Sequence, residues 1–368
     1  MIVESGAFQR LTAWCNLLTA YHNASRGKRG KVEVARFESR LEDNLFELQT
    51  QLRLGTWQPK AYHHFYIHDP KRRLISAAPF ADRVVHHALC QIIEPAFEKS
   101  FVHESFANRV GKGNHRALDH AQHCARHHAY VLQLDVQRFF PSIDHAILHS
   151  LLAQKIHDDR IIDVIGRILV GGGDFPENAS PFVFPGDDLL ALMRPRGLPI
   201  GNLTSQFWAN VYLNPLDHCI KRELPCQAYV RYVDDLLLFA DSKSDLWDWK
   251  AHIEQRMQAL RLRLHPHAQA RPVSEGFGYL GFRVFAHKRR LKPRKGYQYQ
   301  RQMTKMLREH AKGTLSKENM QSSVTAWNNH LGFANTIGLR KALFTKLPAE
   351  WADAWRLPID DSNQKPLQ

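Results

Sequence analysis

The sequence has 368 residues, of which 44% are hydrophobic and 23% are charged, as is common for soluble globular proteins. Fifty Lys and Arg residues against 36 Asp and Glu give a net charge of +14, and the five cysteines form no C-x-x-C pair. The cysteine pattern argues against a zinc or disulfide framework. No apolar run reaches the roughly 18 residues of a membrane span, and Glu4 lies where a signal peptide would be basic. We therefore expect a cytoplasmic, prokaryotic-type protein without a membrane partner.

The first part of the chain predicts helices around a strand. Apolar residues recur at helical spacing over residues 36–54, and Gly55 follows as a helix stop. Residues 62–69 are strand-like. Asp82 is then in place to cap a helix that Pro95 interrupts.

The next part predicts one central strand between helices. Residues 107–118 form a glycine-bearing basic loop that leads into a helix. Residues 130–136, YVLQLDV, are β-branched and apolar, as in a buried strand. Helical sequence then starts at Ser142 or Asp144 and continues to about Val170.

The remaining elements complete an α+β pattern. Residues 171–198 are rich in Gly and Pro, which predicts a long loop insertion, and a helix follows over 202–223. Another helix is expected from Ser244 to Leu264 and a strand in 276–285. The pattern is then helical and basic to about Leu347. Strands mixed with helices, followed by an all-helical end, predict an α+β body with a helical appendage.

Positive charge is concentrated near the end of the chain. Between Arg283 and Lys312 there are eleven Lys and Arg residues and one acid, Glu309, with Tyr297 and Tyr299 among them. A basic stripe with interleaved aromatic residues favours a phosphate backbone and stacked bases. The alternative is a solvated helix face.

The stretch RYVDDLLLFA, residues 231–240, places two adjacent carboxylates between two apolar runs. This pattern predicts a tight hairpin with Asp234 and Asp235 at its tip. Adjacent carboxylates raise one another's pKa unless a cation lies between them, and a divalent cation prefers oxygen ligands. One hairpin supplies too few ligands, and Asp135, which ends a predicted strand, is the best candidate for a third acid. Two Mg²⁺ ions on such acids would support nucleotidyl transfer; the alternative for each lone Asp is a turn or cap residue.

Several stretches resemble motifs of one family, the reverse transcriptases. Three of them, in the family's order, resemble its palm motifs: Asp135-x4-Phe140, GLPIGNLTSQ (197–206) and YVDD (232–235). Others resemble its primer grip and its finger motifs: 277–282, 70–85 and 105–118. Within the family, LPIGNLTSQ is most similar to the enzymes of diversity-generating retroelements.

The resemblance implies a catalytic set of Asp135, Asp234 and Asp235. Two Mg²⁺ ions, for which Mn²⁺ is a possible substitute, would be held by these side chains and by the carbonyl of Val136. The resemblance also implies a right-hand polymerase fold of fingers, palm and thumb. The expected boundaries are an N-terminal helical extension (1–55), fingers (56–130), a palm (131–287) with the insertion at 171–198, a basic helical thumb (288–355) and a disordered tail (356–368).

The resemblance further implies contacts with the incoming nucleotide and the primer. The residues concerned are Lys71, Arg73, Phe140, Ile200, Gly201, Gln206 and Tyr232. Lys71 and Arg73 would contact the triphosphate, and Phe140 would exclude a 2′-hydroxyl. Gly201 would let the backbone approach the nucleotide, and Tyr232 would touch the primer end. The alternatives are ordinary surface charge for the two basic residues and a core position for Phe140.

Ile200 departs from the glutamine that is usual in group II intron and retroviral enzymes. Isoleucine offers only apolar contact, so polar positioning of the nucleotide is lost. In the subfamily that the chain resembles, this residue goes with mutagenic copying. We therefore expect an error-prone RNA-directed DNA polymerase.

The expected partners are a structured RNA template, the primer and cDNA product, dNTPs and, as in many relatives, a small basic accessory protein. Two alternatives stay open. One is an antiviral-defence reverse transcriptase that works on a non-coding RNA or without a template. The other is a non-catalytic RNA-binding protein that kept a polymerase fold.

Overall fold

The computed structural model describes residues 2–4, 6–68, 72–171 and 181–344, with side chains to Arg340. It divides into two compact units. The large unit comprises residues 1–113 and 132–270, and the small unit comprises residues 114–131 and 271–368. Several sequence predictions fall wholly or partly outside the described residues: Lys71, the ends of the stretches 62–69 and 70–85, part of the insertion, the end of the predicted thumb and the tail at 356–368.

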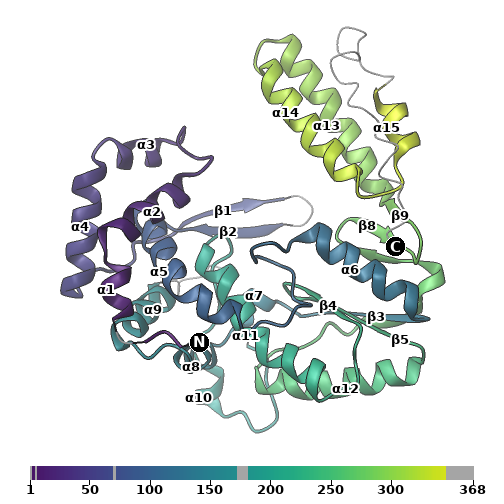
Figure 1. Ribbon diagram of the computed structural model, residues 1–368, viewed down its shortest axis with the longest axis horizontal. Helices are drawn as coiled ribbons and strands as arrows, with labels where there is room; N and C mark the ends of the chain where they lie inside the picture. Colours follow the sequence, from purple (N-terminus) through teal and green to yellow (C-terminus); the bar gives the residue numbers. More distant parts are fainter. Residues whose placement is uncertain (1, 5, 69–71, 172–180, 345–368) are drawn as a thin grey trace. The chain divides into compact units, whose positions relative to one another are not determined.

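The large unit begins with four helices, α1 (Ala7–Leu11), α2 (Trp14–Ser25), α3 (Val32–Glu38) and α4 (Leu41–Leu54) (Figure 1). The single helix predicted over 36–54 is therefore wrong. The chain breaks between α3 and α4, where Arg40 leaves the helical region with φ −134° and ψ 48°. The apolar face continues in α4, which buries Leu45, Leu48 and Leu52 before it ends at Gly55.

Strands β1 (His63–Ile67) and β2 (Arg73–Ala77) pair antiparallel, and the next helix is α5 (Phe80–Glu98). Two predictions for α5 are wrong. Asp82 does not cap it, because the helix begins before it and its carboxylate accepts a hydrogen bond from the Lys60 backbone N–H at 2.8 Å. Pro95 does not interrupt it either. Burial of α5 against neighbouring helices outweighs the hydrogen bond that proline removes.

A four-stranded sheet has the order β4-β5-β3-β6. Its strands are β3 (Tyr130–Asp135), β4 (Tyr229–Tyr232), β5 (Asp235–Ala240) and β6 (Gln269–Pro272). All residues of β5 after Asp235 are buried. Because β5 lies between β3 and β4, the sheet sets the predicted central strand beside the predicted carboxylate hairpin.

Two helices of the large unit flank the β4–β5 hairpin in sequence, α11 (Leu203–Arg222), which contains Pro215, and α12 (Lys243–Ala259). The prediction of a helix as far as Leu264 is wrong. The chain leaves the helix at Arg261, which has φ +53°. Leu264 then pairs with Val136 beside the sheet, and its neighbours Arg263 and His265 form hydrogen bonds with Gln137 and Asp135 that a longer helix would not allow.

Between β3 and α11 lie α7 (Phe139–Ser142), α8 (His145–Ala153), α9 (Asp159–Gly171) and α10 (Leu189–Leu192). Asp144 caps α8 by accepting a hydrogen bond from the Ile147 backbone N–H at 3.0 Å, as one of the two predicted start residues. The predicted helical stretch is interrupted between α8 and α9. The described end of the insertion contains the short helix α10.

The small unit contains α6 (Asn114–His127), the short 3₁₀ helix Val273–Glu275, a three-stranded antiparallel sheet and three C-terminal helices. The strands are β7 (Phe277–Tyr279), β8 (Phe282–Val284) and β9 (Arg289–Leu291). The helices are α13 (Pro293–Ala311), α14 (Lys317–Leu331) and α15 (Ile337–Phe344).

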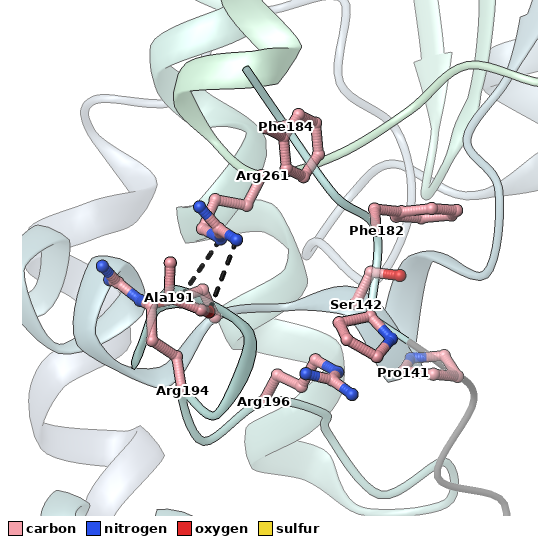
Figure 2. Close-up of a pocket in the computed structure, with 10 residues that line it drawn as sticks. Pro141, Ser142, Phe182, Phe184, Ala191, Arg194, Arg196 and Arg261 are labelled. Carbon is pink, nitrogen blue, oxygen red and sulfur yellow. Dashed lines mark hydrogen bonds and ion pairs between the residues drawn. The ribbon is translucent and has the colours of Figure 1, made fainter. Parts of the chain in front are cut away.

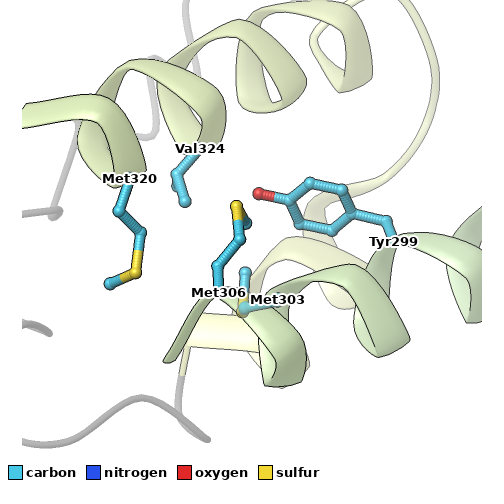
Figure 3. Packing of buried hydrophobic residues seen from close by; sticks show 5 residues of the cluster. All are labelled: Tyr299, Met303, Met306, Met320 and Val324. Carbon is cyan, nitrogen blue, oxygen red and sulfur yellow. The ribbon is translucent and has the colours of Figure 1, made fainter. Parts of the chain in front are cut away.

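Helices α13 and α14 enclose a methionine-rich core made of Tyr299, Met303, Met306, Met320 and Val324 (Figure 3). The Tyr299 ring also stacks on Trp327 with a centroid distance of 3.6 Å. The idea that Tyr299 stacks on bases is therefore wrong, because its ring is already used in this core. Tyr297 is 69% exposed, so its ring is accessible to a base.

Candidate active site

The β4–β5 hairpin carries the two adjacent acids at its tip, as the sequence predicts. Tyr232 pairs with Asp235, so Val233 and Asp234 form the two-residue turn between the strands. Asp135 ends β3, the strand next to β5 in the sheet. The fold thus brings Asp135 and Asp234, 99 positions apart in the chain, to one edge of the sheet.

The two acids interact electrostatically. Burial raises the pKa of Asp234 above its ordinary value, and the Asp135 carboxylate raises it further, while the positive charges of Arg73 and Arg231 oppose the shift. The charges of Asp135 and Arg73 thus both act on the Asp234 carboxylate. Asp135 itself is exposed, so the pair is open to a ligand from one side.

The backbone ladder after β3 determines which way the carbonyl of Val136 can point. Val136 bridges Leu264, and the flanking hydrogen bonds run from Gln137 N to Arg263 O at 2.8 Å and from His265 N to Asp135 O at 2.7 Å. In an antiparallel ladder, a pair between two such bonds directs its own N–H and C=O groups away from the partner strand. The Val136 carbonyl therefore faces away from Leu264.

The donor chemistry fits Mg²⁺ held jointly with a substrate. In the described part of the chain, no three His, Cys, Asp or Glu side chains are gathered closely enough to hold a metal by themselves. Mg²⁺ usually binds one or two carboxylates and completes its shell with water and substrate phosphates. Asp135, Asp234 and the Val136 carbonyl offer that kind of oxygen set.

The loop before α11 connects the predicted nucleotide-contacting residues through its backbone. Leu198 N donates to Phe140 O, and Ser76 N donates to Ile200 O, both at 2.9 Å. The Asn202 side chain binds the backbone of β2 and the residue after it, at Ser76 O and Ala78 N. Phe140 and Ile200 are thereby tied to the strand that begins at Arg73.

Gly201 lies close against β2. Its φ is +120°, and a Cβ atom at this position would come within 2.9 Å of the Ile75 Cγ2 atom. Only glycine fits both this conformation and this contact without strain. Gln206 is exposed on the first turn of α11, and Tyr232 is half-buried in the hairpin; the structure describes nothing of Lys71.

Arg231 is the main residue that the sequence prediction missed. Its side chain is fully buried and forms an ion pair with the equally buried Asp217 of α11 at 2.6 Å. Burial alone would lower the pKa of the Arg231 guanidinium, but the Asp217 carboxylate and its hydrogen bonds more than offset this. One signal was present in the sequence: an arginine alternates with Tyr229 on a strand flanked by apolar residues.

The described end of the insertion forms an arginine-lined pocket beside the loop that follows β3 (Figure 2). Arg194 donates two hydrogen bonds to Asp144 at 2.6 and 2.9 Å, and Arg261 donates two to Asp187 at 2.8 and 2.9 Å. The Arg138 guanidinium lies 4.3 Å from the Phe182 ring centroid. The contacts at Asp144 and Arg138 attach the insertion to the segment that carries Phe140, and the contact at Arg261 attaches it to the residues after α12. The sequence predicted none of them.

Residues 67–284 match the family model described as reverse transcriptase (RNA-dependent DNA polymerase). The chain belongs to this family. The α+β right-hand polymerase fold and the enzyme class expected from the sequence are thereby confirmed. A specific likeness to diversity-generating retroelements is not part of this match.

Curated relatives include two proteins with an intron in their names. The chain is 22% identical to "Protein YkfC" of Escherichia coli, over 70% of this chain and 76% of that protein. It is 26% identical to "Group II intron-encoded protein LtrA" of Lactococcus lactis, over 48% of this chain and 28% of that protein. It is 30% identical to an "Uncharacterized 91 kDa protein in cob intron" of Schizosaccharomyces pombe, over 41% of this chain and 17% of that protein. The chain thus spans less than a third of the last two relatives.

Among solved structures, an apo telomerase from Candida tropicalis, truncated from its C-terminal domain, matches with a TM-score of 0.45. The match has 12% identity and covers 68% of this chain and 60% of that chain.

Proposed function

We propose that the protein copies RNA into DNA by nucleotidyl transfer at Asp135, Asp234 and Asp235. The observation that carries this proposal is the geometry that brings Asp135, at the end of β3, beside the turn that carries Asp234, within the segment that matches the family. Two Mg²⁺ ions, or Mn²⁺ in their place, would activate the primer 3′-hydroxyl and stabilise the leaving pyrophosphate. Asp135, Asp234 and the Val136 carbonyl would hold the metal, with Asp235 as the second acid of the motif.

The residues around the carboxylates would bind and orient the substrate. Arg73 would attract the triphosphate, a role supported by its charge effect on Asp234, and Lys71 would assist. Phe140 would lie under the sugar, and Ile200, Gly201 and Gln206 would line the nucleotide's path. Tyr232, beside the acids in the hairpin, would contact the primer terminus.

The partners that we propose are a structured RNA template, a primer with its cDNA, dNTPs and a small basic accessory protein. The positive charge of α13 supports a duplex grip in the small unit, because its exposed Lys and Arg side chains suit a phosphate backbone. The fingers, palm and thumb boundaries expected from the sequence belong to the same proposal. Within the described ranges, no helix is both long and apolar enough to cross a membrane. The location that we propose is the cytoplasm.

The deciding test is Mg²⁺-dependent primer extension on an RNA template. We expect Asp234→Asn/Asp235→Asn to lower the rate by at least about 10³-fold, since several kcal/mol of charge stabilisation would be lost. Asp245→Asn/Asp248→Asn, which removes two exposed carboxylates of α12, is the matched control and should keep the rate. Equal extension by wild type and the Asp234→Asn/Asp235→Asn variant would refute the proposal and would favour a non-catalytic RNA-binding protein.

For the biological setting we propose a diversity-generating retroelement with error-prone copying, and the residue that supports it is Ile200. Ile200→Gln would restore a polar group beside the nucleotide, so we expect fewer misincorporations, above all opposite template adenines. Sequencing of cDNA made in vitro measures this, with Val183→Gln in the insertion as control. An unchanged error spectrum would remove the support and leave the antiviral-defence role as the better setting.

A further inference from the structure

A buried polar network lies directly behind the carboxylate turn. Arg231 donates to both oxygens of Asp217, from Nε at 2.7 Å and from Nη2 at 2.6 Å. The Tyr229 hydroxyl donates to the same carboxylate at 2.8 Å. Arg231 Nη1 donates to the Asn210 side-chain oxygen at 3.1 Å. The ion pair is therefore fully buried and well supplied with hydrogen bonds.

Such a pair is a poor source of stability. Removing two charges from water is costly, and apolar residues of similar volume often fold equally well in place of a buried ion pair. The energetics alone therefore do not explain why the strand carries a charge at this position.

The same guanidinium also holds the catalytic turn. Arg231 Nη1 donates to the Val233 carbonyl at 3.0 Å. Val233 has φ +58°, a left-handed conformation that a β-branched residue rarely adopts. Val233 immediately precedes Asp234, so its conformation sets the direction of that carboxylate.

The arginine is fixed from its backbone as well. Arg231 N donates to Glu104 O, and Phe106 N donates to Arg231 O, both at 2.9 Å. The Asn210 amide donates to Ala107 O, also at 2.9 Å. The segment 104–107 and α11 thus hold both the main chain and the side chain of Arg231.

We propose that Arg231 is a positioning residue, clamped by Asp217, that fixes the Val233–Asp234 turn and so aims the Asp234 carboxylate. The inference rests on the proposed polymerase function. It assigns the buried ion pair to the geometry of the reaction and not to the stability of the fold.

The first experiment replaces the network by apolar residues. In Arg231→Met/Asp217→Leu/Tyr229→Phe, no charge stays buried alone, so we expect a folded protein with an unfolding midpoint close to wild type. Its kcat for primer extension should fall about 10- to 100-fold, as when the support of a metal ligand is lost, with KM for dNTP nearly unchanged. Arg40→Met/Asp43→Leu removes an exposed Arg–Asp pair of the same residue types and should change neither value. A folded triple variant with wild-type kcat would overturn the inference.

The second experiment keeps the charge and tests the coupling to the turn. Lys at position 231 can pair with Asp217 but lacks the planar fork that also reaches Val233, so Arg231→Lys should lower kcat. The loss should be smaller in a Val233→Asn background, because asparagine tolerates the left-handed conformation better than valine. A purely structural role predicts equal losses in both backgrounds, and that result would overturn the inference even if the triple variant does not fold. Absence of extension by the wild type would instead contradict the proposed function.

Discussion

In the described part of the large unit, the antiparallel strand pairs β4–β5 and β1–β2 are built in opposite ways. In β4–β5, strand β4 holds a buried ion pair, the apolar residues of β5 are buried, and the turn is bound by a guanidinium. In β1–β2, every residue of β1 is exposed, including Phe65, Tyr66 and Ile67. The β4–β5 pair is thus held by burial and by hydrogen bonds to its turn, whereas β1 presents aromatic and apolar side chains to solvent.

The difference fits two separate tasks within the proposed function: positioning carboxylates and contacting nucleic acid. Carboxylates that direct a reaction need fixed positions, because small misplacements cost rate. A surface that meets a nucleic acid needs accessible aromatic side chains more than a rigid core. The loop at Ile200–Asn202 links the two, since it is hydrogen-bonded to β2 and leads into α11, which carries Asp217.

The largest effect is expected from breaking the ion pair on one side only. Asp217→Leu leaves Arg231 buried without its counter-charge, so the free energy of unfolding should fall by about 3–5 kcal/mol. Urea denaturation measures this. On the exposed pair, Arg72→Leu removes a guanidinium that lies 4.0 Å from the Tyr66 ring centroid, and it should cost less than about 1 kcal/mol. Similar costs for the two variants would contradict the contrast between the two strand pairs.

An intermediate effect is expected at Gly201, where the linking loop touches β2. Gly201→Ala forces a methyl group against Ile75 and should lower the free energy of unfolding by about 1–3 kcal/mol more than Gly186→Ala does. Gly186 also has a positive φ, +86°, but no atom lies within 4 Å of the place that a Cβ atom would take there. The two variants therefore distinguish the effect of the contact with Ile75 from the effect of a positive φ. KM for dNTP should rise only in the Gly201 variant, and equal behaviour of the two would show that the contact with Ile75 is unimportant.

The smallest effect on stability is expected on the exposed strand. Phe65→Ser should change the free energy of unfolding by less than about 0.5 kcal/mol. Its affinity for a template–primer duplex should nevertheless fall by about 1–3 kcal/mol, if the ring stacks on a base. Fluorescence anisotropy measures the affinity, with Val32→Ser, at a residue 74% exposed on α3, as control. Unchanged affinity would exclude Phe65 from the nucleic-acid surface.

The hairpin and its distant partner acid could be predicted because both follow from local rules. Two acids between apolar runs predict a tip, and an acid at the end of an apolar strand predicts a place at the sheet edge. Arg231 and Asp217 could not be paired in advance, because their contact depends on how α11 lies against β4. The same reason explains the insertion: its Arg194 meets Asp144, and its Asp187 meets Arg261 after α12, only in the folded chain.

Local rules also failed where packing overrode them. Pro95 and Asp82 carry ordinary signals for a helix break and a helix cap, yet α5 continues through one and starts before the other. Tyr299 lies among Lys and Arg residues in the sequence, which is typical of a nucleic-acid contact, but its ring stacks on Trp327 in the core of the small unit. In each case a buried contact stabilises the observed structure more than the local preference stabilises the alternative.

The sequence by itself determined the family, the α+β class and the acids at the predicted site, because their order, spacing and strand pattern are properties of the chain. Only the tertiary structure decided what holds those acids in place. The ion pair behind the turn, the contact of Gly201 with β2 and the arginine contacts of the insertion each join segments far apart in sequence. Their energies arise from burial and hydrogen-bond geometry, which exist only once the chain has folded.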